Sequence, residues 1–117
     1  ILAGDALLTE AFAVLAETQN SAAVACLAQG AGWLGMVGGQ CLDLQQEHQV
    51  SDAHLLSTIH QLKTGKLMRA ALELGAIFGH ASSRQISALG SFGEALGLAF
   101  QIKDDLKAAR KSAMEAY

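Results

Sequence analysis

Proline is absent from this chain of 117 residues, and aromatic residues make up only 5 % of it. At an average usage of roughly 5 %, about six prolines would be expected. A β-sandwich or barrel would need more threonine, valine, tyrosine and proline-marked turns. Alanine and leucine are abundant instead. The composition therefore predicts an all-α fold, and the length is that of one domain or of part of a larger one.

Charge of either sign is also sparse. Charged residues make up 16 % of the chain, and eight Lys and Arg against eleven Asp and Glu give a net charge of −3. A nucleic-acid binder would carry a dense cationic face, so we expect no nucleic-acid partner. The hydrophobic content of 51 % excludes an intrinsically disordered chain.

Only two cysteines occur, Cys26 and Cys41, and both lie in apolar helical stretches. Their spacing fits neither a metal site nor a disulfide framework. We interpret them as two buried thiols in a reducing compartment and predict a cytoplasmic location. No basic region precedes the first apolar residues, and we expect no signal peptide.

The segment from Thr18 to Leu42 carries no charged residue. As a helix it would be roughly 37 Å long, enough to cross a bilayer, and Gly35 and Gly39 have the GxxxG spacing of paired membrane helices. Against this, the segment contains Gln29 and other polar residues and lacks flanking basic ones. A helix buried on all sides of a large soluble bundle explains the same composition, so we predict no membrane span.

Hydrophobic periodicity and capping residues predict four helices, over residues 5–17, 22–47, 53–78 and from 83 towards 117. The sequence Lys63-Thr64-Gly65 predicts a kink or irregularity within the third helix, with Ser51 or Asp52 as its cap. Gly79 suits a left-handed cap at its end. Glycines in a helix cost up to about 1 kcal/mol each relative to alanine. The five in the second helix indicate that another segment approaches its backbone closely.

Two sets of residues recur along the fourth helix. Glycines every three or four residues, at 90, 93 and 97, would let another helix pack close. An apolar stripe is expected to face the core; it consists of Ile86, Leu89, Phe92, Leu96 and Phe100.

Asp104 and Asp105 are adjacent acids near the end of an apolar stretch, and Gln101 shares their helical face. Adjacent carboxylates repel each other unless a cation binds between them. Mg²⁺ accepts one or two carboxylates together with phosphate oxygens. A helix that emerges into solvent at Lys103 explains the pair equally, and the pair alone leaves both interpretations open.

Two further groups of polar residues have the same ambiguity. Gln40 and Asp43 are neighbours at the end of the uncharged segment, where they either face a cavity or are solvated. Lys63 begins a run of three basic residues at three-residue steps, and Thr64 follows it. Lysine and threonine donors together suit a phosphate. A surface patch is the alternative, because the frame of a P-loop is absent.

The histidines indicate no metal site. His48, His54 and His60 are six positions apart, which rotates them by about 240° per step around a helix. We therefore expect them, and His80 in a loop, to be surface or helix-end residues.

Taken in order, the segments ILAGDALL, GGQCLDL, IHQLKTGKL and GLAFQIKDD resemble the trans-polyprenyl diphosphate synthase family, with its short-chain, farnesyl-diphosphate-synthase-like branch the most similar. The resemblance covers residues 1–105. It implies an all-α isoprenoid synthase bundle around a deep central cavity. It also implies a prenyltransferase, active as a homodimer with Mg²⁺, that condenses isopentenyl diphosphate with an allylic diphosphate such as dimethylallyl or geranyl diphosphate.

The same resemblance implies a role for each motif residue. Asp104 and Asp105 open the family's second aspartate-rich motif, which holds Mg²⁺ on the allylic diphosphate. Lys63 matches the lysine that contacts this diphosphate. Together with Lys63, the residues expected to line the substrate site are Thr64, Gln101, Gln40 and Asp43.

The sequence departs from the family pattern after Asp105. The second motif is DDxxD, but Ala108 takes the place of its third acid. The first aspartate-rich motif and the residues that bind isopentenyl diphosphate are missing as well. We interpret the sequence as an incomplete synthase domain, and we expect interruptions between Asp105 and Leu106 and near Gln19. The alternative is a non-catalytic partner subunit or scaffold of the same fold, which Ala108 would fit.

Overall fold

The computed structural model describes residues 1–49 and 52–117, and no strand occurs in these ranges. The all-α prediction is therefore confirmed. The elements are α1 (Leu2–Glu17), α2 (Ser21–Ala31), α3 (Met36–Gln45), α4 (Ala53–His60), the π-helical turn η1 (Gln61–Gly65), α5 (Lys66–Phe78) and α6 (Ser83–Glu115).

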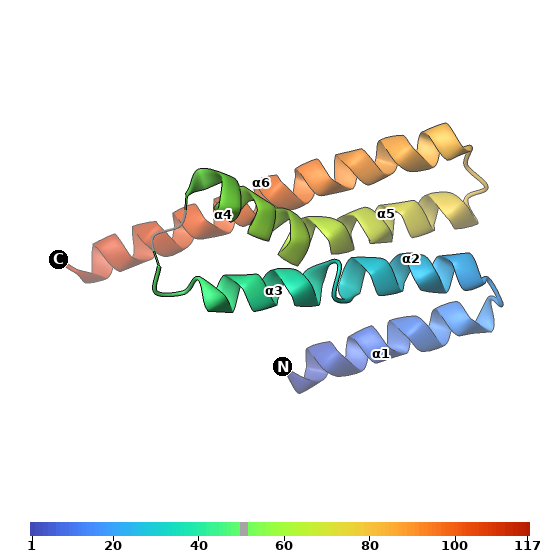
Figure 1. Cartoon of the computed structure of the whole chain (residues 1–117), viewed down its shortest axis with the longest axis horizontal. Coiled ribbons are helices and arrows are strands. Elements are labelled where there is room, and N and C mark those ends of the chain that lie inside the picture. Colours follow the sequence, from blue (N-terminus) through green and yellow to red (C-terminus); the bar gives the residue numbers. More distant parts are fainter. Residues whose placement is uncertain (50–51) are drawn as a thin grey trace.

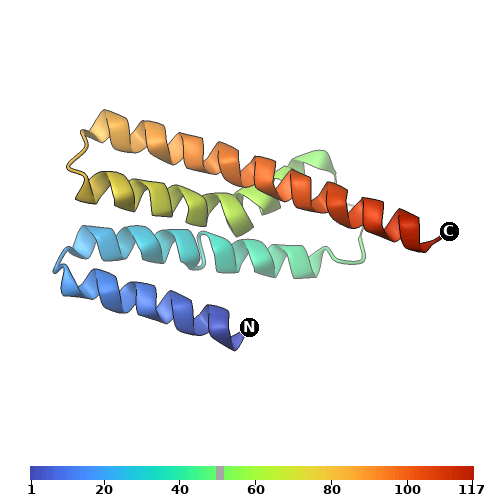
Figure 2. The ribbon, with the colours of Figure 1, turned by 180° about the vertical axis from the view of Figure 1, so that it is seen from behind.

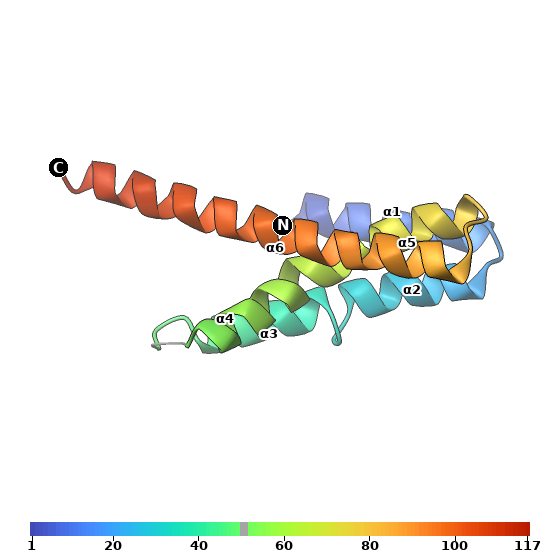
Figure 3. The same cartoon turned by 90° about the horizontal axis from the view of Figure 1, so that it is seen from above.

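The helices lie side by side in the order α1, α2, α5 and α6 (Figure 1), and the view from behind shows the same order (Figure 2). Helix α3 continues roughly in line with α2, while α4 and η1 lie against α3 and α6. Seen from above, the C-terminal part of α6 diverges from α3 and α4 (Figure 3), and residues 102–117 are all exposed.

The prediction of one helix over residues 22–47 is wrong. Helix α2 ends at Ala31, and the chain turns through residues 32–35 before α3 begins. Gly32 adopts φ −84° and ψ −151°, and a Cβ there would lie 2.6 Å from the carbonyl oxygen of Ala28. The break thus depends on a position without a side chain, which hydrophobic periodicity does not reveal.

The apolar segment Ser21–Gln45 has the length and composition of a membrane span, with a mean hydropathy of 1.3. Core helices of soluble proteins have the same properties. Here the segment is divided into α2 and α3, and its buried residues pack toward α5 and η1. The absence of a membrane span stays a prediction.

The irregularity predicted in the third helix is confirmed. Residues Gln61–Gly65 form a π-helical turn between α4 and α5. Asp52 caps α4 by accepting a hydrogen bond from the backbone N–H of Leu55 at 2.7 Å. The alternative cap, Ser51, lies outside the described residues. The left-handed cap expected at Gly79 is wrong, because Gly79 has φ −81° and His80 takes the positive φ of 56°.

The interruptions expected in the chain stay predictions. Helix α6 continues from Ser83 to Glu115 through the Asp105–Leu106 bond, so Ala108 does lie one turn beyond the acids. At the other place, Gln19 closes the turn between α1 and α2 with φ 57°. Asn20 then caps α2 by accepting from the N–H of Ala23 at 3.1 Å.

The apolar stripe of α6 does not face the core, contrary to prediction. Phe92 is 58 % exposed and Phe100 49 %, whereas the glycines at 90, 93 and 97 are buried. A Cβ at Gly97 would lie 2.8 Å from the Cα of Gly65. The helix therefore packs through its smallest residues, because only there can its backbone approach α5 and η1 this closely. Helix α1 begins at Leu2, before its predicted start at residue 5, and it has no fully buried residue.

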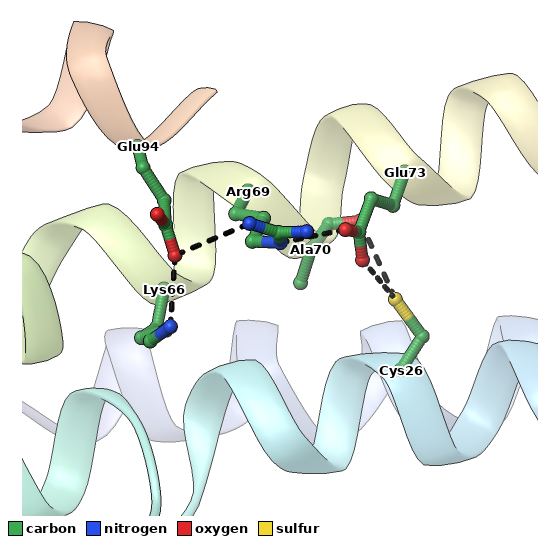
Figure 4. Close-up of polar contacts among 6 residues, drawn as sticks. All are labelled: Cys26, Lys66, Arg69, Ala70, Glu73 and Glu94. Atoms are coloured by element: carbon green, nitrogen blue, oxygen red, sulfur yellow. Dashed lines mark hydrogen bonds and ion pairs between the residues drawn. The ribbon is translucent and has the colours of Figure 1, made fainter. Parts of the chain in front are cut away.

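A charged network joins α2, α5 and α6 (Figure 4). Glu94 Oε1 lies 2.8 Å from Lys66 Nζ and 3.5 Å from Arg69 Nη1, and Arg69 Nε contacts Glu73 Oε1 at 2.7 Å. The hydrogen bond from Lys66 lowers the pKa of Glu94. Cys26 donates to Glu73 Oε2 at 3.5 Å, and burial, aided by Glu73, raises the pKa of its thiol to about 11.

Both cysteines are free, but they are half-buried, where full burial was expected.

Gly75 offers a test of the packing. It lies inside α5, and a Cβ there would meet no atom within 4 Å. We expect Gly75→Ala to raise the free energy of unfolding by about 0.5–1 kcal/mol, because alanine is the better helix former and nothing obstructs its methyl group. Urea denaturation measures this difference, and a loss of stability would show that the space beside α5 is filled.

Candidate active site

The candidate site is built around η1, which α3 approaches from one side. Gly39 of α3 is buried, and a Cβ there would lie 2.7 Å from the Cβ of Leu62 and against the backbone N of Lys63. One turn further along α3, Asp43 Oδ2 forms an ion pair with Lys63 Nζ. The predicted close approach to the glycine-rich segment is therefore present, and it places Asp43 beside Lys63.

Helix α6 approaches η1 from the other side through the contact between Gly97 and Gly65. One turn beyond Gly97, Gln101 Oε1 accepts a hydrogen bond from Thr64 Oγ1 at 3.1 Å. Gln101 Nε2 in turn donates to Asp105 Oδ1 at 3.2 Å. Thr64, Gln101 and Asp105 thus form one polar cluster, although Gln101 lies 37 positions after Thr64 in the sequence.

In the π-helical turn, two consecutive residues contact the helices on opposite sides of η1. Lys63 contacts α3, whereas Thr64 contacts α6. A π-turn widens the helix locally, and such turns are frequent at functional sites. The electropositive stretch expected here is balanced by acids from other elements, because Lys63, Lys66 and Arg69 all form ion pairs.

Gln40 and Asp104 are exposed and less constrained. Gln40 lines a groove of about 490 Å³ together with Lys63 and Thr64. The rest of its lining is largely apolar: Met36, Val37, Cys41 and Leu44. The side chain of Asp104 forms no hydrogen bond or ion pair with the other described residues, in contrast to that of Asp105. The predicted residues therefore gather around η1, except that no contact ties Asp104 to the cluster.

His60 was missed by the sequence analysis, which expected a surface or helix-end residue. It does end α4, but it is only 7 % exposed, and its Nε2 lies 3.2 Å from Asp105 Oδ2. The other three histidines are exposed as expected. The spacing between histidines held no information on this contact. The position of His60 three residues before Lys63 was the available signal, since such neighbours share a helical face.

The donor set limits the kind of metal that fits. No group of three or more His, Cys, Asp or Glu side chains suited to a metal occurs among the described residues. A metal held by these residues alone therefore does not fit. Mg²⁺ requires fewer protein ligands, because it is bound through one or two carboxylates plus substrate phosphates and waters. Asp104 and Asp105, two adjacent exposed carboxylates, fit that role.

A family model described as Polyprenyl synthetase matches residues 1–115. The chain belongs to the polyprenyl synthetase family. It is 44 % identical over 111 residues to the farnesyl diphosphate synthase of Micrococcus luteus and 46 % identical over 114 residues to that of Haemophilus influenzae. Both alignments cover 91 % of this chain, but they cover only 38 % and 39 % of the two relatives.

Solved structures agree with this assignment to the polyprenyl synthetase family. The crystal structure of an FPP/GFPP synthase from Zymomonas mobilis superposes with a TM-score of 0.80 at 38 % identity, covering 92 % of this chain and 41 % of that one. The family recognised from four sequence segments is therefore confirmed. The chain spans about two fifths of the length of these polyprenyl synthetase relatives, and the roles of its individual site residues stay predictions.

Proposed function

We propose that this chain supplies the allylic-diphosphate side of a trans-prenyltransferase. The enzyme would condense isopentenyl diphosphate with dimethylallyl or geranyl diphosphate to give a short-chain polyprenyl diphosphate. The observation that carries the proposal is the cluster around η1, where Lys63 and Thr64 line a largely apolar groove and Thr64 is linked through Gln101 to the carboxylate of Asp105. That arrangement suits a substrate with an anionic head and a hydrocarbon tail.

The polar cluster would bind the diphosphate of the allylic substrate, and the apolar groove would hold its hydrocarbon part. Lys63 would exchange its partner Asp43 for the diphosphate, and Thr64 and Gln101 would orient the same group by hydrogen bonds. Mg²⁺ at Asp104 and Asp105 would neutralise the charge that develops on the departing diphosphate. The apolar lining of the groove would keep water away from the allylic cation. The double bond of isopentenyl diphosphate would then attack this cation, and the released diphosphate would accept the proton that leaves.

The direct test is an assay of the purified complete enzyme that contains this chain, with labelled isopentenyl diphosphate and geranyl diphosphate. We expect a longer prenyl diphosphate to form with Mg²⁺ present, and its formation to fall to background after EDTA and to return on adding Mg²⁺ again. Product formation that EDTA does not affect would contradict the metal-assisted step. No product at saturating Mg²⁺ would contradict the enzyme itself.

Ala108 supports a second candidate, a non-catalytic partner subunit or scaffold of the same fold. It lies on the uninterrupted helix α6, one turn after the two acids, where the DDxxD motif has its third carboxylate. A protein that is silent alone and as Ala108→Asp, but raises the turnover of a catalytic family member, would be such a subunit. Gain of activity in Ala108→Asp would favour the enzyme.

The homodimer and the cytoplasmic location belong to the same proposal. The homodimer rests on the family resemblance, and the location on the two free cysteines.

A further inference from the structure

His60 is the one polar or charged residue that is buried in the described part of the chain. It ends α4 immediately before the π-helical turn, and its Nε2 points to Asp105 Oδ2 at 3.2 Å. Nε2 has to carry the hydrogen in this contact, because an ionised carboxylate only accepts. The burial of the ring, with its side chain 9 % exposed, fixes the donor in place.

Asp105 by itself would be a mobile group, since its side chain is 52 % exposed. Its second oxygen, Oδ1, accepts from Gln101 Nε2 at 3.2 Å. Gln101 is held in turn by Thr64, which lies four residues after His60 on the same continuous segment. The contacts therefore link four side chains in a row, from His60 through Asp105 and Gln101 to Thr64, and each oxygen of Asp105 has a side-chain nitrogen 3.2 Å away.

We propose that His60 is a positioning residue, which orients Asp105 toward the metal and diphosphate of the proposed site. The inference rests on the proposed function. His60 touches neither substrate nor metal; it acts by directing the remaining lone pairs of Asp105 outward. Donors to a ligating carboxylate usually change metal affinity by 10–100-fold when they are removed.

The first measurement needs no ligand. A double-mutant cycle of His60→Leu and Asp105→Ala, followed by urea denaturation of the apo protein, reports whether the two side chains interact. We expect clear non-additivity, because each single change removes the same contact. Additive effects would overturn the positioning role whatever the protein catalyses.

The second measurement is the affinity for Mn²⁺ in the presence of inorganic diphosphate, followed by the EPR signal of free Mn²⁺. We expect His60→Leu to weaken binding by 10–100-fold, and His60→Gln to restore most of it, because the glutamine amide can place an N–H near the position of Nε2. In the Asp105→Ala background, His60→Leu should cause no further loss.

Failure of the positioning role of His60 and failure of the proposed function give different results. Equal loss of affinity in His60→Gln and His60→Leu, or a further loss in the Asp105→Ala background, would show that His60 acts only as a core residue. Absence of Mn²⁺ binding by the wild type, with an intact coupling in the apo cycle, would instead overturn the proposed function and leave His60 as a purely structural contact.

Discussion

Asp104→Ala in the complete enzyme is expected to lower the rate of isopentenyl diphosphate condensation by orders of magnitude without lowering the melting temperature of the apo protein. The carboxylate would hold Mg²⁺ at the departing diphosphate, and the loss of this ligand should raise the barrier by several kcal/mol, as about 1.4 kcal/mol corresponds to a tenfold change in rate. The fold loses no polar interaction, because the exposed side chain of Asp104 forms no hydrogen bond or ion pair with the described residues. Removing one of two adjacent like charges leaves stability unchanged or slightly raised.

Steady-state condensation with geranyl diphosphate at saturating Mg²⁺, beside thermal melts of the apo proteins, measures both effects. Glu10→Ala is the matched control, since it removes an exposed acid from α1, far along the sequence from the site. Retention of most of the wild-type rate in Asp104→Ala would show that its carboxylate does not hold the metal and would favour the partner subunit. A lower melting temperature, with activity falling in proportion, would indicate a structural role.

Gly39→Ala should damage both the fold and the site. The added Cβ would lie 2.7 Å from Leu62 Cβ and 2.8 Å from the backbone C of Leu62. Backbone atoms cannot move aside as a flexible side chain does, so α3 and η1 have to separate. We expect a loss of about 1–3 kcal/mol in the free energy of unfolding, which outweighs the helix propensity gained with alanine. Condensation activity should fall with it, because Lys63 would move away from Asp43 and Gln40.

Urea denaturation and the condensation assay test this prediction, with Gly75→Ala as the matched control. Both variants add one methyl group to a helical glycine, but the space beside Gly75 is open. Wild-type stability in Gly39→Ala would contradict the close packing of α3 against η1. Reduced stability with full activity would contradict the placement of the site there.

The sequence predicted the parts of this fold that depend on local patterns. These parts are the helical ranges other than 22–47, the irregularity at Lys63-Thr64-Gly65 and the segments that indicate the family. Gln101 and Asp105 were assigned to the site by motif, and in the structure Gln101 contacts both Thr64 and Asp105.

The remaining features depend on contacts between segments. An amphipathic pattern shows which residues of α6 are apolar, but not that the backbone packs through the glycine face and leaves Phe92 and Phe100 outside. The burial of His60 likewise depends on α6, which lies more than twenty residues away in sequence. The break between α2 and α3 was not predicted, because hydrophobic periodicity does not distinguish a glycine that permits a turn from a small residue inside a helix.

The glycine contacts of α6 also have a mechanical consequence. Helices that interlock through large side chains resist sliding along their axes. A face made of Gly90, Gly93 and Gly97 fixes the distance between α6 and α5, but it has few side chains that would oppose sliding. The position of α6 along its axis relative to α5 then depends on Glu94, which forms ion pairs with Lys66 and Arg69 of α5. Because Lys66 lowers the pKa of Glu94, the stabilisation from these ion pairs is fully present above the usual pKa of a glutamate. It is lost only as the pH falls through the lowered pKa of Glu94. Asp105 lies three turns further along the same helix, so its position along the bundle is set by charges at a distance from the site itself.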